Sequence, residues 1–199
     1  MTAAERLYYE RRAAEYDDWY LGTGLFQQRI RPGWSEEVRA LQGVLAALRL
    51  PSVLDIACGT GFLSASLDAH VVGLDQSASM LAIAANRIPG AVFVRGDALH
   101  LPFRTNVFEC LMAAHFYGHL DNNARTLFLN EARRVAKSVL VIDAAKRDDV
   151  PFEEHQERVL QDGSRHMVYK RYFTPERLMA EIGTGRILYS GRWFVAVLA

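Results

Sequence analysis

Short hydrophobic runs alternate with segments of helical period along the chain from Val53 onward. This alternation is typical of a parallel sheet with helices on both faces, the doubly wound α/β class. Five strands are predicted, in the runs VLDIA from Val53, VVGLD from Val71, AVFVRG from Ala91, FECLMAA from Phe108 and VLVIDAA from Val139. Between them, hydrophobic residues at i, i+3 and i+4 predict crossover helices over residues 62–69, 77–88 and 122–136. Ser77 and either Asp121 or Asn122 are the expected N-caps.

The segment after the fifth strand changes character. Residues 150–173 are polar and charge-rich, and within them FEEHQERVLQ suggests a helix and RHMVYKRYF a strand. We interpret residues 151–173 as an insertion on the substrate side. Thr174 as N-cap and Pro175 at the first helical position predict a short helix that ends near Gly183. The tail divides at Ser190-Gly191 into two strands, which form a hairpin at one sheet edge and bring the total to seven.

The pattern upstream of Val53 is helical. Residues 3–20 and 36–48 have helical character, and residues 21–32 are expected to be a loop. We therefore predict a single domain with two parts. Residues 1–49 form a helical cap over the open end of the sheet, and residues 50–199 form a Rossmann-like domain.

Composition and charge exclude several classes. Lys plus Arg and Asp plus Glu both number 23 in 199 residues, so no overall field favours nucleic acid. The charged first twenty residues do not resemble a signal peptide, and no apolar run has the length of a membrane span, so a cytoplasmic protein without membrane insertion is expected. The two cysteines, Cys58 and Cys110, give neither a disulfide framework nor a metal-site spacing.

The strongest chemical signal is the run VLDIACGTG, in which a buried strand enters a turn containing Gly59 and Gly61. Glycine permits a tight reversal and lets the backbone approach a ligand beyond the carboxyl ends of the strands. Asp75 ends the next strand, where a carboxylate can accept both protons of a ribose diol. Asp97 closes the third strand, where it can accept from an exocyclic amino group such as that of adenine. Together these positions indicate an adenosine-bearing ligand.

Asp55 distinguishes between two candidate ligands, a dinucleotide and S-adenosylmethionine. The glycine turn loosely matches the dinucleotide fingerprint, but a carboxylate just before it would repel a pyrophosphate by about 1 kcal/mol or more. The same carboxylate favours a ligand that carries an ammonium and a sulfonium. S-adenosylmethionine has both groups, together with the ribose and the adenine.

The runs VLDIACGTG, VVGLDQSASML, VRGDALHLPF and FECLMAAHFYGHL resemble, in order and spacing, the motifs of class I S-adenosylmethionine-dependent methyltransferases. The likeness is greatest to the small-molecule branch that includes the ubiquinone and menaquinone methyltransferases. One departure is Ala57, where the family often has Gly. The resemblance implies a seven-stranded sheet whose last strand is antiparallel.

The resemblance also implies roles for individual residues. Cofactor-binding residues are expected at Tyr16, Asp55, Ala57, Gly59, Gly61, Asp75, Gln76, Met80, Asp97, Ala98 and Ala114. The acceptor is expected beside the end of the fourth strand, with His115 as the first candidate for a base because imidazole titrates near neutral pH. Contacts to the acceptor are predicted from Tyr20, His115, Tyr117 and His119. No metal is expected.

Two points stay open in the sequence. The basic cluster of Arg165, His166, Lys170 and Arg171 fits either an anionic acceptor or, as charge runs usually do, a solvated strand face. The expected function is methyl transfer from S-adenosylmethionine to a small molecule, with protein or RNA as other acceptors. The alternatives are a non-catalytic S-adenosylmethionine-binding protein and, less favoured, an NAD-dependent oxidoreductase. The sequence identifies neither the acceptor nor the oligomeric state.

Overall fold

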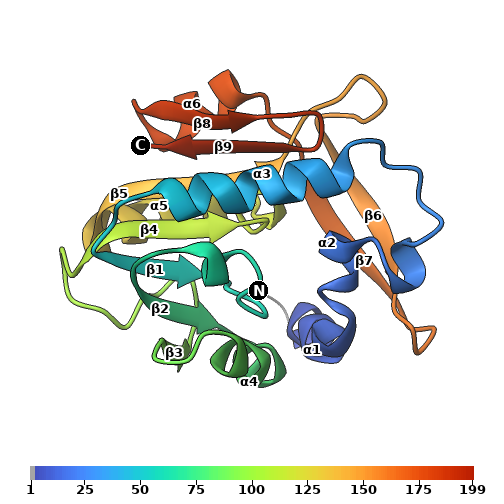
Figure 1. The fold of residues 1–199 in the computed structure, drawn as a ribbon, viewed down its shortest axis with the longest axis horizontal. Coiled ribbons are helices and arrows are strands. Elements are labelled where there is room, and N and C mark those ends of the chain that lie inside the picture. Colours follow the sequence, from blue (N-terminus) through green and yellow to red (C-terminus); the bar gives the residue numbers. More distant parts are fainter. Residues whose placement is uncertain (1–2) are drawn as a thin grey trace.

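A seven-stranded sheet organises the molecule, in a computed structural model that describes residues 3–199 (Figure 1). The strand order is β3-β2-β1-β4-β5-β9-β8. Its strands are β1 (Ser52–Ile56), β2 (His70–Asp75), β3 (Val92–Arg95), β4 (Phe108–Ala114), β5 (Ala136–Ala144), β8 (Arg186–Ser190) and β9 (Phe194–Leu198). Strands β1 to β5 pair in parallel, whereas β9 is antiparallel to β5 and to β8. The predicted fold class and the carboxyl-terminal hairpin are confirmed.

Both faces of the sheet are buried. Along β4, Cys110 and Met112 point to one hydrophobic cluster, and Leu111 and Ala113 point to the other. Helix α3 (Trp34–Ala47) covers the first face. Helices α5 (Asn122–Val135) and α6 (Pro175–Ile182) cover the second. This two-sided burial explains why the strands appear as continuous hydrophobic runs rather than as alternating patterns.

Side-chain caps begin three of the helices where the sequence predicts them. The Ser77 hydroxyl accepts from the Met80 amide at 3.1 Å at the start of α4 (Ala78–Arg87). Asp121 caps α5 through the Ala124 amide at 2.8 Å. Thr174 caps α6, with Pro175 as its first residue. These local signals fix the helix starts independently of tertiary contacts.

Two predicted helices are wrong. Residues 62–69 form only a 3-10 turn, η3 (Ser64–Ser66), because the Ser64 hydroxyl bonds the Asp55 carboxylate and Leu63 is held in the core beneath. The run FEEHQERVLQ contains strand β6 (Glu153–Val159), which pairs antiparallel with β7 (Arg165–Arg171) in a separate two-stranded sheet. Pairing with β7 across the short connection of residues 160–164 overrides the local helical preference of the run.

The amino-terminal helical region is interrupted. It consists of α1 (Ala3–Arg12), η1 (Ala13–Glu15), α2 (Asp18–Leu21) and η2 (Gly24–Phe26), and Met1 and Thr2 of the predicted cap lie outside the described residues. Helix α1 contacts α4 and β7, beside the carboxyl ends of the parallel strands (Figure 1). Helix α3, although within residues 1–49, packs on the sheet face.

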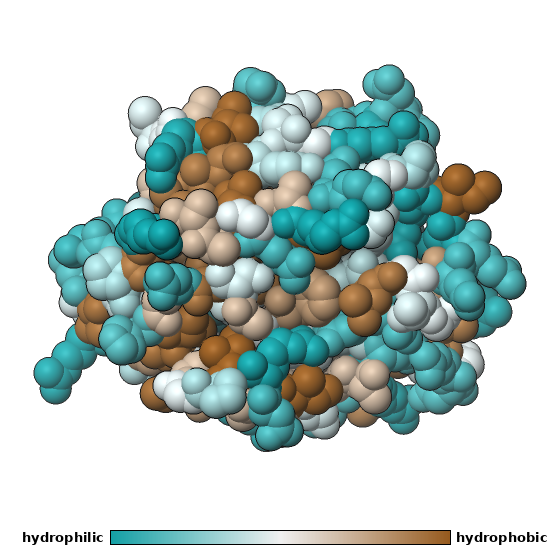
Figure 2. All heavy atoms as spheres, viewed as in Figure 1, coloured by the Kyte–Doolittle hydropathy of each residue, from teal (hydrophilic) through white to brown (hydrophobic). Residues whose placement is uncertain are grey.

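Polar and apolar side chains are interspersed on the face of the molecule seen in Figure 2. Among the described residues, no helix combines the length and the apolar character that crossing a bilayer requires.

Asp143 connects three elements at the end of β5. Its side chain is fully buried, and Oδ1 accepts from the Lys170 ammonium of β7 at 2.6 Å. Oδ2 accepts from the Gly118 amide at 2.7 Å, in the turn η4 (Tyr117–His119) that follows β4. The charge of Lys170 keeps the pKa of the Asp143 carboxyl below its usual value despite burial. One carboxylate thus positions both the β6–β7 sheet and the segment after β4.

Replacing Asp143 by Ala is expected to lower the free energy of unfolding by about 3–5 kcal/mol, because it leaves the buried Lys170 ammonium unpaired. Urea denaturation measures this change. The matched control is Glu109→Ala, which breaks the exposed pair with Lys137 and is expected to cost less than about 1 kcal/mol. Equal effects of the two substitutions would contradict the role of Asp143.

Candidate active site

A cavity of about 800 Å³ lies at the carboxyl ends of the parallel strands. This is the edge at which open α/β sheets bind ligands, and the volume suits a drug-sized molecule. Its floor is formed by residues that follow β1 to β4, and its roof by α1, the turn after it and strand β7. The predicted cofactor residues on its wall are Tyr16, Ala57, Gly59, Asp75, Gln76, Met80, Asp97 and Ala98.

The glycine turn adopts left-handed backbone conformations that favour glycine. Gly59 has φ 54° and Gly61 φ 70°, and Ala57 shares the region with φ 52° although it has a side chain. A Cβ at Gly59 would come within 3.2 Å of the Tyr16 ring, so glycine is needed where the roof meets the turn. Gly61 instead faces Ala84 and Ile88 and is not on the cavity wall. Its role is close packing of the turn on α4.

Asp75 joins the glycine turn to the start of α4. Its Oδ2 accepts from the Gly59 amide and its Oδ1 from the Ser77 amide, both at 2.9 Å. Burial raises the pKa of this carboxyl. A carboxylate has about four lone-pair sites, so two remain for a diol in the cavity. Beside it, the Gln76 side-chain oxygen is buried and has no partner among the described residues.

The end of β3 supplies the next part of the wall. The Asp97 carboxylate accepts from the Leu99 amide at 3.0 Å and remains partly exposed to the cavity. Ala98 is buried and presents a small apolar surface next to it. A planar ring with a hydrogen-bond donor at its edge fits this combination of acceptor and apolar surface.

Asp55 lies behind the glycine turn rather than on the main cavity wall. It borders a small second hollow together with Tyr20 and Ala114, which are likewise absent from the wall of the main cavity. Oδ2 accepts from the Ser64 hydroxyl, and Oδ1 is buried without a partner among the described residues. Burial raises the pKa of Asp55 to about 7. Direct contact of Tyr20 and Ala114 with a ligand in the main cavity is not supported by this arrangement.

Carboxylates of the amino-terminal segment fasten the roof, and the sequence analysis missed all of them. Asp17 accepts from the Thr60 hydroxyl in the glycine turn and pairs with Arg87 of α4. Glu10 accepts from the amide and hydroxyl of Ser79, at 3.1 and 2.7 Å. Glu15 accepts from the amide of Gln161, in the β6–β7 connection, at 3.0 Å. The only sequence signal was the density of acids near the amino terminus.

His115 follows β4 and lines the cavity. Its backbone has φ 54°, and its ring packs against Trp19 and Phe194, with centroids 4.7 and 5.3 Å away. Both ring nitrogens are buried and have no partner among the described residues. Burial lowers the pKa of His115 to about 3, so the imidazole is neutral at physiological pH.

His119 and Tyr117 have different positions in the following turn. His119 lines the cavity, and its Nδ1 lies 2.6 Å from the Tyr169 carbonyl. A carbonyl can only accept, so Nδ1 carries the proton and Nε2 keeps its lone pair. Burial lowers the pKa of His119 to about 3. Tyr117 was predicted to contact the acceptor, but it packs in the core against Phe173, and its hydroxyl donates to Glu181 at 3.2 Å.

The basic cluster on β7 is not a solvated face. Lys170 and Arg171 are buried and pair with Asp143 and Glu181, both at 2.6 Å. Arg165 is exposed and pairs with Glu157. Arg165 and His166 also line the cavity. The described residues contain no group of three or more His, Cys, Asp or Glu side chains able to hold a metal ion.

Comparison with known proteins agrees with this geometry. Residues 53–138, which contain the glycine turn and both strand-end acids, match the family model described as methyltransferase domain. That match covers less than half of the chain's 199 residues, and over it the chain is similar to this family.

Two curated relatives show which proteins the chain is similar to in sequence. The chain is 38% identical over 90 residues to a demethylmenaquinone methyltransferase of Thermotoga maritima, an alignment that spans 43% of this chain and 38% of that protein. It is 32% identical over 132 residues to a fatty-acid O-methyltransferase of Mycolicibacterium smegmatis, covering 60% of this chain and 45% of that protein. The chain therefore spans less than half the length of these relatives.

Solved structures share the fold over nearly the whole chain. A DhpI-SAM-HEP complex superposes with a TM-score of 0.76 at 22% identity and covers 100% of this chain and 99% of the other. The glycopeptide N-methyltransferase MtfA complexed with S-adenosylmethionine gives a TM-score of 0.60 at 18% identity, covering 80% and 85% of the two chains. The likeness shows that residues 53–138 and the segments around them share the fold of these structures.

The raised pKa of Asp55 makes stability depend on pH in a predictable direction. Because the carboxyl binds its proton more tightly in the folded state (pKa about 7) than in the unfolded one (3.8), stability is lost as pH rises between these values. Asp55→Asn is therefore expected to stabilise the ligand-free protein more at about pH 8 than at about pH 5 in urea denaturation. The exposed Asp68→Asn is the control and should show no such difference. An Asp55→Asn effect independent of pH would contradict the prediction.

Proposed function

We propose that this protein is an S-adenosylmethionine-dependent methyltransferase that acts on a small-molecule acceptor. The observation that carries the proposal is the convergence of the glycine turn, Asp75 and Asp97 on one cavity of about 800 Å³. That volume has room for the cofactor and a modest acceptor. The relatives named for demethylmenaquinone and fatty acids support a small molecule as the acceptor.

The residues present fit this cofactor. The free lone pairs of Asp75 suit the ribose diol, and the unpartnered Gln76 oxygen offers a further acceptor beside it. Asp97 and Ala98 suit the amino edge and the face of adenine, and Met80 closes the apolar side. Gly59, with Tyr16 directly above it, is left for the methionine part. When bound, S-adenosylmethionine supplies a methyl group on a sulfonium, which is primed for in-line displacement.

Asp55 has an electrostatic role in this proposal. Its pKa of about 7 means that a nearby ammonium shifts the carboxyl to the charged form, which then favours the ammonium in return. Its position behind the turn, with Oδ1 unpartnered, is that of a supporting charge rather than of a group on the main cavity wall. The same buried acid disfavours the pyrophosphate of NAD.

The chain excludes water and orients the acceptor, and we assign it no general base. A histidine whose pKa is about 3 is too weak a base to take a proton from a hydroxyl group near neutral pH. His119 instead offers its neutral Nε2 as a hydrogen-bond acceptor on the cavity wall, whereas both ring nitrogens of His115 are buried and its ring contributes packing. Without a base, the acceptor must reach the cavity already deprotonated at the atom that is methylated. A cytoplasmic location and the lack of a nucleic-acid partner stay predictions from the sequence.

Calorimetric titration with S-adenosylhomocysteine and, separately, NAD tests the cofactor. We expect saturable binding of S-adenosylhomocysteine and none of NAD. Asp75→Asn should weaken S-adenosylhomocysteine about 10- to 100-fold, because hydrogen bonds to a charged group contribute about 1.5–3 kcal/mol. Arg104→Gln, an exposed change before β4, is the control. Preference for NAD, or binding of neither ligand, would overturn the proposal.

The role of the two histidines predicts a pH profile. An acceptor is first found by screening small molecules for S-adenosylhomocysteine release. With that acceptor, the plot of kcat against pH should show no inflection from a titrating histidine between about pH 5 and 8. His119→Ala should raise the acceptor KM about tenfold, the loss of one hydrogen bond, with little change in cofactor affinity. The exposed His70→Ala should match the wild type. An inflection near pH 6.5 that one variant abolishes would instead identify that histidine as a base.

A further inference from the structure

Residues 21–31, at and after the end of α2, form an exposed loop on the side of the molecule where β6 and β7 lie (Figure 1). Three of its large aliphatic side chains face solvent: Leu21 is 61% exposed, Leu25 47% and Ile30 93%. Apolar atoms project at the right-hand edge of Figure 2, where this loop runs in Figure 1. Single exposed aliphatic side chains are common on protein surfaces, but three in one short segment require an explanation. We refer to residues 21–31 as the apolar loop.

Aromatic side chains at its base hold the apolar loop in a defined shape. Phe26 is buried, and so is Trp34, whose Nε1 donates to the Tyr20 carbonyl at 2.8 Å. The Arg31 guanidinium donates to the Trp19 carbonyl at 3.0 Å and so joins the end of the loop to α2. The aliphatic side chains are therefore presented from a backbone that is anchored at both ends.

The apolar loop carries positive charge without a compensating acid. Residues 19–35 contain no Asp or Glu, and their two cations are Arg29 and Arg31. Neither forms an ion pair among residues 6–199, and both guanidinium groups lie near the Phe26 ring, 4.8 and 5.7 Å from its centre. Burial, and after it the charge of Arg29, lowers the pKa of Arg31 to about 10, which leaves Arg31 charged near neutral pH. Two like charges this close together attract an anionic surface.

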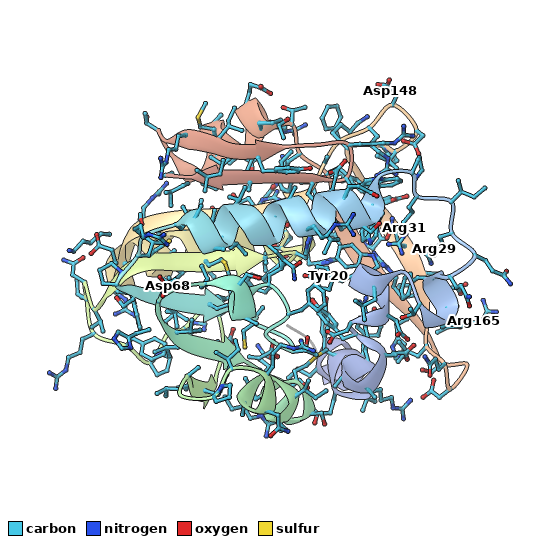
Figure 3. All side chains as sticks on the ribbon, in the orientation of Figure 1. Tyr20, Arg29, Arg31, Asp68, Asp148 and Arg165 are labelled. Atoms are coloured by element: carbon cyan, nitrogen blue, oxygen red, sulfur yellow. The ribbon has the colours of Figure 1, made fainter. Side chains whose placement is uncertain are left out.

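The acid that directly precedes the apolar loop is engaged at its base. Asp18 accepts from the Thr23 hydroxyl at 2.6 Å and from the Gln161 side chain at 3.1 Å. Figure 3 shows Arg29 and Arg31 close together on the side of the molecule formed by this loop. Because the whole chain has no net charge, the positive charge here is a local property of the loop.

A bilayer surface combines an apolar interior with anionic headgroups, and an aliphatic tip flanked by arginines fits both. A stable protein partner buries about 800 Å² on each side, whereas the exposed aliphatic side chains here are confined to one projecting loop. We propose that the apolar loop attaches the protein to a lipid bilayer with anionic headgroups. Leu21, Leu25 and Ile30 enter the headgroup region, and Arg29 and Arg31 contact lipid phosphates. The attachment is peripheral, goes beyond the proposed function and does not depend on it.

Sedimentation with lipid vesicles tests the proposal. The protein should bind vesicles of equal parts phosphatidylcholine and phosphatidylglycerol, less so as salt is added, and should not bind phosphatidylcholine alone. Ile30→Ser should weaken binding about tenfold, because an aliphatic side chain no longer leaves water. Arg29→Gln should weaken it about fivefold, equivalent to about 1 kcal/mol for one cation at an anionic surface.

Both substitutions are at exposed positions, so the fold should be retained, which circular dichroism checks. The matched controls are Val107→Ser and Arg104→Gln, at exposed positions just before β4 and at its start, which should bind vesicles like the wild type. Equal binding by Ile30→Ser and the wild type would overturn the proposal, as would equal binding to the two kinds of vesicle or binding to neither. A wild-type dimer in size-exclusion chromatography that Ile30→Ser converts to a monomer would assign the loop to a second copy of the chain and would also overturn it.

Titration with S-adenosylhomocysteine separates this proposal from the proposed function. Ile30→Ser and Arg29→Gln should bind S-adenosylhomocysteine with the wild-type Kd, because both side chains are outside the cavity wall. Vesicle binding without S-adenosylhomocysteine binding in the wild type would overturn the proposed cofactor and leave the lipid contact standing. S-adenosylhomocysteine binding without vesicle binding would overturn the lipid contact alone.

Discussion

The buried carboxylate of Asp143 is the constraint on which the acceptor side of the molecule depends. A charge with no exposure to solvent must be fully paired, and Asp143 achieves this with the Lys170 ammonium and backbone amides. The partners outside β5 belong to β7 and to the turn after β4. As a result, the β6–β7 sheet is fixed in position beside the carboxyl end of β5. The cavity wall that includes His119 and Tyr169 exists because of that attachment.

The cofactor side follows from a different rule. Parallel strands bring their carboxyl ends to one edge of the sheet. The acids at the ends of β2 and β3 and the glycine turn after β1 therefore lie at the same edge. The floor of the cavity is therefore formed at and just after the strand ends, and the roof is a separate part of the chain. Its contacts with the floor come mainly from carboxylates of the amino-terminal segment, with a small apolar cluster of Tyr8, Leu160 and Val168 between α1 and the β6–β7 sheet.

Local signals made much of this structure predictable. Strands β1 to β5, the caps at Ser77 and Thr174, and the acids at Asp75 and Asp97 depend on residues close in sequence, and the structure places them as expected. The misassigned elements depend on contacts that the periodicity of the run does not reveal, although their partners are close in sequence. β6 is a strand only because β7 pairs with it, and residues 62–69 lose their helix to the bond between Ser64 and Asp55. The partner of Asp143 is 27 positions away, and the partners of Asp17 are 43 and 70 positions away, beyond any periodicity.

The manner in which the roof is fastened also determines how a ligand enters and leaves. Asp17, Glu10 and Glu15 hold the roof through hydrogen bonds and one ion pair at its rim, and two of these three attachments are at exposed positions. Opening the roof therefore means exchanging a few polar contacts for water and uncovering buried apolar surface such as the Tyr8 ring, which is 2% exposed. The residence time of a bound ligand should accordingly respond both to salt, which screens exposed charges, and to denaturant, whose effect scales with the surface uncovered.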